Sequence, residues 1–143
     1  MDLRTEALSV ISEACIYSDP LKGPQVYYKR VKWEVIGYIL PGFRSRRFWL
    51  KAVRLYLPYV HSENAVNLLV NKNRLYGNRQ LYLMGTLGIL IRSIDKIERI
   101  ANIQRSVQIG EKVSLLLDEP MSDSYKDLFN YAILAVLLID GRL

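Results

Sequence analysis

Cysteine and histidine are nearly absent from this chain of 143 residues, which contains one of each, Cys15 and His61. A single cysteine excludes an internal disulfide, so the fold does not depend on an oxidising compartment. One histidine and one cysteine cannot supply the three or four nitrogen and sulfur ligands of a zinc site. The carboxylates show no calcium-loop spacing either. We therefore expect no metal site and no cofactor.

The sequence also lacks the motifs of common enzyme classes. It has no Gly-x-Ser-x-Gly and no glycine-rich phosphate loop that ends in Lys-Ser or Lys-Thr. We expect His61 to be a surface residue near a helix cap, and Cys15 to be a buried, inert thiol on an apolar helix stripe. Nothing separates the carboxylate pair Asp118 and Glu119 from ordinary surface acids. We therefore predict a protein that is not an enzyme, with no catalytic residues and no small-molecule substrate.

Long apolar runs are missing as well, because a membrane-spanning helix takes about 20 such residues. The two most apolar stretches, Leu81 to Ile91 and Ala132 to Ile139, are shorter and predict core helices. The acidic N-terminal residues lack the apolar core of a secretory signal. Five prolines and eight glycines are too few for a linker-rich chain. The sequence thus predicts a single domain over residues 1–143, cytoplasmic or nuclear and not secreted, with peripheral membrane attachment as an alternative.

Positive charge is present in excess, and one segment contains it. Residues 22–79 hold twelve Lys and Arg and two acids, a net charge of +10, whereas the whole chain carries +6. Ten of the fifteen aromatic residues lie in the same segment. Basic side chains neutralise phosphates, and aromatic rings stack on unpaired bases or lie at a membrane interface. Because solubility does not require so large an excess, we predict that this segment forms a binding face.

Apolar residues at spacings of three and four predict most of the chain to be helical. Helices are expected at 2–17, 45–57, 79–104 and 124–139, with a further one between the caps Ser62 and Gly77.

Helix boundaries and core positions follow from the same pattern. Asp2 is the expected cap of the first helix, and Ser124 with Asp127 matches a capping box for the last one. Asp140-Gly141 is expected to end that last helix. Leu81 to Ile91 is apolar nearly all round, so we expect it at the centre of the core.

Strict alternation predicts a minor β component. At 26–40, Val31, Trp33 and Val35 alternate with charged residues, which is typical of a half-buried strand. The apolar residues of 107–117 also share one parity and favour a strand, although a short helix from Glu111 fits as well. The predicted fold class is mainly α with a minor β component (α+β).

A strand, a glycine-containing turn and a basic helix are expected to follow one another over residues 28–57. In this order the segment resembles the matrix proteins of negative-strand RNA viruses, whereas the largely helical C-terminal half departs from their pattern. The resemblance implies a non-enzymatic structural protein that contacts nucleic acid or membrane.

We therefore predict a structural or assembly protein, expected to be a homo-oligomer, that binds a polyanionic nucleic acid, with RNA favoured. Two alternatives remain: a peripheral matrix-type protein that binds an anionic membrane surface through the same face, and a regulatory domain that docks on an acidic protein. No known nucleic-acid-binding signature is present, so contacts would go mainly to phosphates. The residues predicted to bind are Lys29, Arg30, Lys32, Arg44, Arg46, Arg47, Trp49, Lys51, Arg54, Lys72, Arg74 and Arg79.

Overall fold

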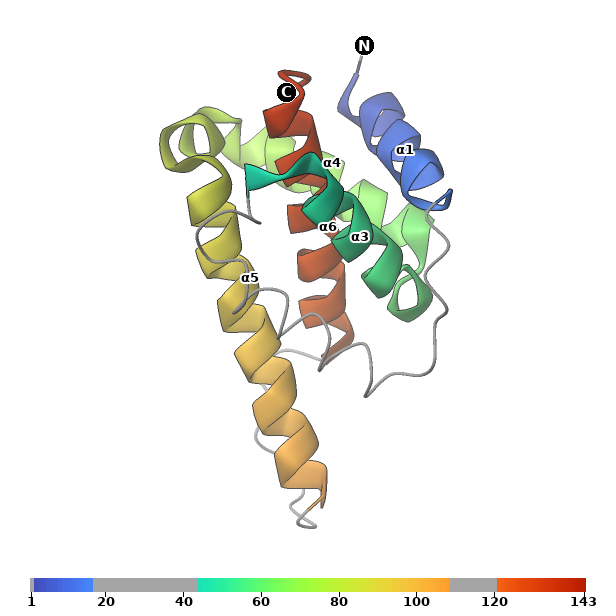
Figure 1. Ribbon diagram of the computed structural model, residues 1–143, viewed down its shortest axis with the longest axis vertical. Helices are drawn as coiled ribbons and strands as arrows, with labels where there is room; N and C mark the ends of the chain where they lie inside the picture. The colour runs from blue at the N-terminus through green and yellow to red at the C-terminus, as the bar shows by residue number, and fades with distance from the viewer. Residues whose placement is uncertain (1, 17–43, 109–120) are drawn as a thin grey trace.

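The computed structural model describes residues 2–16, 44–108 and 121–143. The helices are α1 (Leu3–Ala14), α3 (Arg46–Tyr56), the short 3-10 helix η2 (Leu57–Tyr59), α4 (Ser62–Tyr76), α5 (Arg79–Gln108) and α6 (Met121–Ile139) (Figure 1). No strand occurs within these ranges, so the expected minor β component is wrong and the described fold is all-helical.

The structure describes none of the first predicted strand and only the start of the second. The segment 26–40 lies outside the described residues, and so do residues 109–117. Residues 107 and 108 belong to helix α5, which continues past its predicted end at residue 104. The reason is that the helical stripe of Ile97, Ile100 and Ile103, all buried, continues up to the start of this turn. The alternation of apolar residues from 107 onward predicted the local structure less well than the helical spacing of these isoleucines.

Helix α6 forms the centre of the core. It packs against α1, α3, α4 and α5, and Figure 1 shows α3 crossing in front of it. Between Ser124 and Leu137 every residue except Lys126 and Tyr131 is buried. Phe129 and Ile133 are completely enclosed. A helix that is apolar on nearly all sides is stable only when other helices surround it, which explains its central place.

The helix ends largely confirm the predicted caps. The Thr5 N–H donates to Asp2 Oδ1 at 2.7 Å, as expected for the cap of α1. Gly77 and Gly141 end α4 and α6 with φ of 68° and 67°. The cap of α4 is His61 rather than Ser62, because the exposed His61 Nδ1 accepts the Asn64 N–H at 3.4 Å.

Two local predictions are wrong. Helix α6 begins at Met121, so Ser124 and Asp127 lie inside the helix and form no capping box. Ser124 Oγ accepts a hydrogen bond from Arg99 instead, at 2.7 Å. Cys15 is exposed rather than buried, because α1 ends at the last buried stripe residue before it. The thiol therefore follows the stripe instead of belonging to it.

Helix α5 is interrupted near its start. Gly85 has φ 61° and ψ −163°, a conformation that only glycine adopts readily, so residues 79–84 and 86–108 are two helical segments joined by a break. Gly88 lets the segments approach: a Cβ there would lie 2.3 Å from Met84 Cβ. Within the described ranges, no helix is both long and apolar enough to cross a membrane.

The break overturns the expectation that Leu81 to Ile91 lies at the centre of the core. Ile89 and Leu90 are buried, each 2% exposed. Leu83, however, is 76% exposed, and Leu87 and Ile91 are each about half exposed. The segment before Gly85 follows a different axis from the rest of α5, so its apolar side chains do not all face α6.

Candidate functional site

Helix α3 separates its apolar and basic residues onto two faces. Its apolar face, with Trp49, Leu50 and Val53, is buried against α6 and α1. On the other side, Arg47, Lys51 and Arg54 recur at spacings of four and three residues, which places them in one row along the helix, and Arg44 comes just before the N-cap Ser45. We call this group the outer stripe; it consists of Arg44, Arg47, Lys51 and Arg54. The first two members are exposed and the other two are half-buried.

Arg46 lies outside the outer stripe, and its guanidinium forms ion pairs with two carboxylates. Its Nη2 donates to Glu13 Oε1 at 2.7 Å, and its Nε donates to Asp140 Oδ1 at 2.7 Å. The hydrogen bond from Arg46 outweighs burial and lowers the pKa of Glu13. Burial raises the pKa of Asp140, but hydrogen bonds from Arg46 and Arg142 outweigh it, so this pKa is also lowered. Arg46 thus joins α1, α3 and the C-terminal end of α6.

The aromatic residues that the structure describes between residues 44 and 79 are mostly enclosed. Trp49, predicted to bind, is 2% exposed and packs edge-on against Phe48, with ring centroids 5.0 Å apart. Tyr59 is half-buried and stacks on Tyr125, with centroids 4.5 Å apart. Among the aromatic residues described between 44 and 79, Tyr76 alone is mostly exposed, at 76%. The ring of Trp49 therefore belongs to the core and offers no face to a stacking base.

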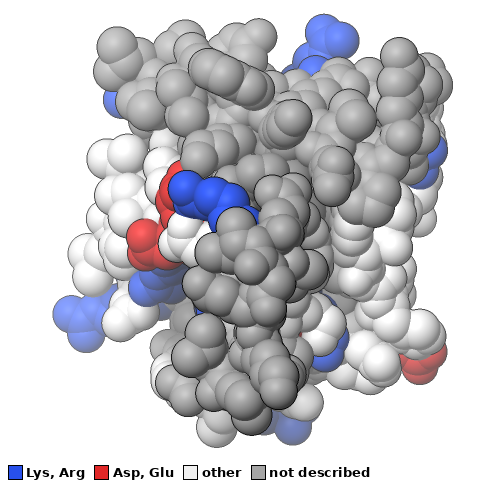
Figure 2. Space-filling view, turned by 90° about the horizontal axis from the view of Figure 1, so that it is seen from below, with Lys and Arg blue, Asp and Glu red and all other residues white. Residues whose placement is uncertain are grey.

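The remaining predicted residues lie away from α3. Arg74 and Arg79 are exposed at the turn between α4 and α5, and Lys72 lies one turn earlier in α4, 3.2 Å from Asp127. Lys29, Arg30 and Lys32 are outside the described residues. Figure 2 shows the molecule from below the view of Figure 1, where the visible Lys and Arg side chains are scattered among residues drawn in grey. Of the residues predicted to bind, the described bases thus lie at α3 and near the α4–α5 turn.

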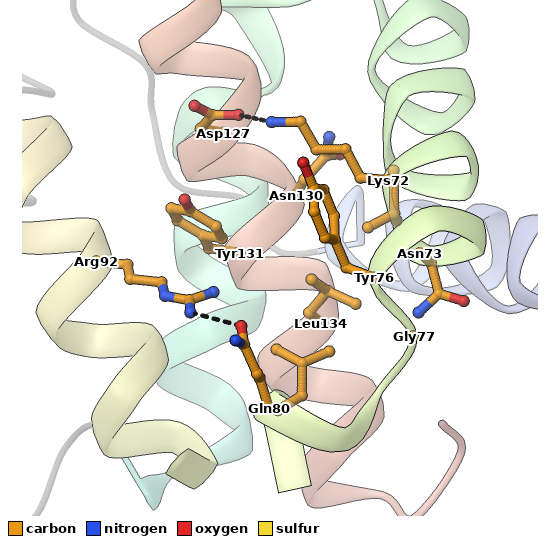
Figure 3. A pocket seen from close by; sticks show the side chains of 12 residues that line it. Lys72, Asn73, Tyr76, Gly77, Gln80, Arg92, Asp127, Asn130, Tyr131 and Leu134 are labelled. Carbon is orange, nitrogen blue, oxygen red and sulfur yellow. Dashed lines mark hydrogen bonds and ion pairs between the residues drawn. The ribbon is translucent and has the colours of Figure 1, made fainter. Parts of the chain in front are cut away.

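A cavity of about 310 Å³ lies between α4, α5 and α6, and sequence reasoning did not find it. Figure 3 shows Tyr76 standing over it, with Gln80 and Arg92 joined by a hydrogen bond of 3.2 Å at one side. Its polar lining comprises Lys72, Asn73, Gln80, Arg92, Asp127, Asn130 and Tyr131. These residues come from three helices, so no local sequence signal could have brought them together.

One acceptor in this cavity wall is unsatisfied. Asn130 is 5% exposed, and its Nδ2 donates to the Ala65 carbonyl at 2.9 Å, which fixes the orientation of the amide. Its Oδ1 is buried without a hydrogen-bond partner among the described residues. Burial, followed by the charge of Asp127, raises the pKa of Tyr131, so its hydroxyl stays protonated. A buried acceptor without a donor is costly.

Exposed apolar side chains concentrate beside the same cavity. Of the nine large hydrophobic residues exposed within the described ranges, seven lie between residues 75 and 91. We call this group the apolar corner; it consists of Leu75, Tyr76, Tyr82, Leu83, Met84, Leu87 and Ile91. Figure 1 shows the α4–α5 turn projecting from the helical body. The glycine at position 85 is the sequence feature from which a break here could have been inferred.

The comparisons add no relative: the chain matches no protein-family model, no curated protein and no solved structure. The likeness of residues 28–57 to viral matrix proteins therefore stays a prediction. Within the described residues, no group of three or more His, Cys, Asp or Glu is placed to hold a metal ion. The site must be interpreted from its own geometry.

Proposed function

We propose that this protein is a non-enzymatic binding protein that holds a polyanion, with RNA favoured, along the outer stripe of α3. The observation that carries the proposal is the spacing of Arg47, Lys51 and Arg54 on one face of α3, with the exposed Arg44 just before the N-cap of that helix. The sequence between Glu34 and Glu63 contains no acid, so no negative charge of its own helix weakens this row. A linear row of cations suits the regular phosphates of a nucleic-acid strand.

RNA is favoured as a single strand or an irregular structure contacted through its phosphates. The buried position of Trp49 removes one expected stacking residue, so base-specific contacts are not part of the proposal. Arg46 is also left out, because its guanidinium already binds Glu13 and Asp140. Binding should then depend strongly on salt and weakly on sequence.

Fluorescence anisotropy with a labelled single-stranded RNA over a salt series tests this proposal. The triple variant Arg44→Gln/Arg47→Gln/Lys51→Gln should bind more weakly, and the slope of log K against log salt should fall by about 0.7 for each phosphate that the variant no longer neutralises. The matched control removes three bases outside the stripe, Arg4→Gln/Arg105→Gln/Lys126→Gln, and so changes the net charge equally.

Equal losses in the two triple variants would mean that only net charge matters, and the outer stripe would have no special role. Failure of the wild-type chain to bind RNA at low salt would reject the proposal. Anionic vesicles or an acidic protein that bind through the same three residues would favour one of the alternatives. The expectation of a homo-oligomer stays a prediction, and light scattering on the purified chain tests it.

A further inference from the structure

The apolar corner has an unusual charge environment. From residue 64 to residue 94 the chain contains no Asp or Glu and four bases, Lys72, Arg74, Arg79 and Arg92. Arg74 and Arg79 are exposed and lie next in sequence to the apolar residues of the α4–α5 turn. Within residues 64–94 the corner thus combines exposed hydrophobic side chains with bases alone, while Asp127 of the adjoining cavity is paired with Lys72 and Lys96.

The apolar corner is continuous with the rim of the cavity. Tyr76 belongs to both, since it is 76% exposed and also lines the cavity. The Met84 Sδ lies 3.7 Å from Arg92 Nη2, and the same nitrogen donates to Gln80 Oε1 at 3.2 Å. Arg92 and Gln80 line the cavity wall, as Figure 3 shows. A surface that met the apolar corner would therefore also cover the cavity mouth.

We propose that the apolar corner docks on an anionic phospholipid membrane, and that the cavity receives the headgroup of one lipid. Apolar side chains that enter the interfacial layer and bases that meet anionic headgroups act together in peripheral membrane binding. Tyr76 and Tyr82 have the amphipathic rings that suit this layer, and the long stems of Arg74 and Arg79 allow their charges to reach the headgroups. This surface is separate from the outer stripe, so the inference does not depend on RNA binding.

Charge favours a membrane over a second copy of the chain. In a symmetric dimer through the apolar corner, Arg74 and Arg79 of both copies would approach, without an acid between residues 64 and 94 to neutralise them. An anionic lipid surface neutralises the same bases. The projecting shape of the α4–α5 turn also suits entry into a headgroup layer (Figure 1).

The cavity supplies one group that matches an anionic headgroup. Arg92 has N–H donors beyond the one given to Gln80, and a guanidinium binds phosphate through paired hydrogen bonds. Phosphatidylglycerol carries the net negative charge that this guanidinium would meet, whereas phosphatidylcholine has no net charge.

Vesicle flotation of the full chain tests the docking. The wild type should float with vesicles of phosphatidylcholine that contain phosphatidylglycerol, and not with phosphatidylcholine alone. Leu83→Glu should weaken binding by roughly tenfold or more, because burial of one leucine contributes that much to partitioning. Leu8→Glu is the matched control, since Leu8 is 47% exposed on α1, and it should bind as the wild type does.

Absence of wild-type flotation, or equal behaviour of Leu83→Glu and Leu8→Glu, would overturn the proposal. A third result would also overturn it: the wild type does not bind vesicles, and Leu83→Glu dissociates an oligomer that light scattering detects in the wild type. The apolar corner would then be an interface between copies of the chain. Arg92→Gln tests the headgroup and should reduce the preference for phosphatidylglycerol. Soluble glycerol 3-phosphate that binds as tightly as vesicles would show a free phosphate ligand instead. The two proposals are tested independently. The outer-stripe triple variant is expected to lose RNA binding and still to float with the phosphatidylglycerol vesicles.

Discussion

Helix α3 and the apolar corner are built from similar residues and arrange them in opposite ways. In α3 the apolar side chains are buried and the bases face outward, whereas in the apolar corner large hydrophobic side chains are exposed beside exposed arginines. The difference lies in continuity. Helix α3 keeps one axis for three turns and so one face toward α6, while Gly85 changes the direction of α5. Hydrophobicity alone therefore does not decide burial; the orientation of each turn relative to α6 does.

The same contrast exists between two neighbouring charges. Arg46 and Arg47 are adjacent in sequence and about 100° apart around α3. Arg46 contacts Glu13 and Asp140 and helps to hold three helices together, while Arg47 is exposed in the outer stripe. Composition describes both as parts of one basic segment, but their angular positions decide which of the two forms the ion pairs and which is exposed.

The largest expected difference between α3 and the apolar corner comes from replacing a leucine by alanine in each. Leu50→Ala in α3 should lower the free energy of unfolding by about 2–5 kcal/mol, because Leu50 is 1% exposed and its loss leaves a cavity. Leu83→Ala, at 76% exposure, should change it by about 0.5 kcal/mol or less. Urea denaturation measures both. Similar losses in the two variants would contradict the exposed position of Leu83.

The adjacent arginines give a second, smaller contrast. Arg46→Gln should cost about 2 kcal/mol, a value kept low because the Arg46 side chain is 35% exposed and solvent weakens its ion pairs. Arg47→Gln should change stability by about 0.5 kcal/mol or less. The same denaturation experiment measures both, and a larger effect at Arg47 would reverse the assigned roles.

The contribution of Arg46 should depend on pH in a defined direction. The pKa values of Glu13 and Asp140 are lowered in the folded chain, so their ion pairs stabilise it fully above the unfolded pKa of about 4. This contribution is lost as the pH falls through the lowered folded values. The stability gap between wild type and Arg46→Gln should therefore be present at neutral pH and shrink below about pH 4. A constant gap down to pH of about 2 would exclude this carboxylate network.

The break at Gly85 gives a smaller expected loss of stability than Leu50→Ala or Arg46→Gln. Gly85→Ala should lower stability by about 1 kcal/mol, because its φ of 61° with ψ −163° is strained for any residue with a Cβ. A Cβ at Gly85 meets no atom within 4 Å, so the cost would come from the backbone alone. Thermal unfolding followed by circular dichroism measures it. A gain in helicity together with a gain in stability would mean that a continuous α5 is the preferred state.

Much of the described fold could be predicted from local spacing. The three- and four-residue rows located α1, α3, α4 and α6, and Asp2, Gly77 and Gly141 marked helix ends. The burial of Leu81 to Ile91 was predicted wrongly because an apolar run records what can be buried, and the neighbours that bury it come from distant parts of the chain. The position of Cys15 depended on a helix end that lies three residues before its predicted place, at Ala14 instead of residue 17.

In the candidate site, too, the features within one helix could be predicted, and those shared by several helices could not. The row of bases in α3 follows from their spacing within a single helix. The engagement of Arg46 could not be predicted, because Glu13 and Asp140 lie 33 and 94 residues away. The cavity around Asn130 likewise needs three helices in place. Periodicity describes one element at a time, so sites shared by several elements stay hidden from it.

The central place of α6 has a consequence for biosynthesis. Helix α6 contacts α1, α3, α4 and α5, yet it is the last of them to be made. While the ribosome still holds residues 121–139, the apolar faces of the earlier helices have no common partner to cover them. Native packing must therefore be completed after α6 emerges, and the nascent chain is exposed to aggregation and to chaperone binding until then.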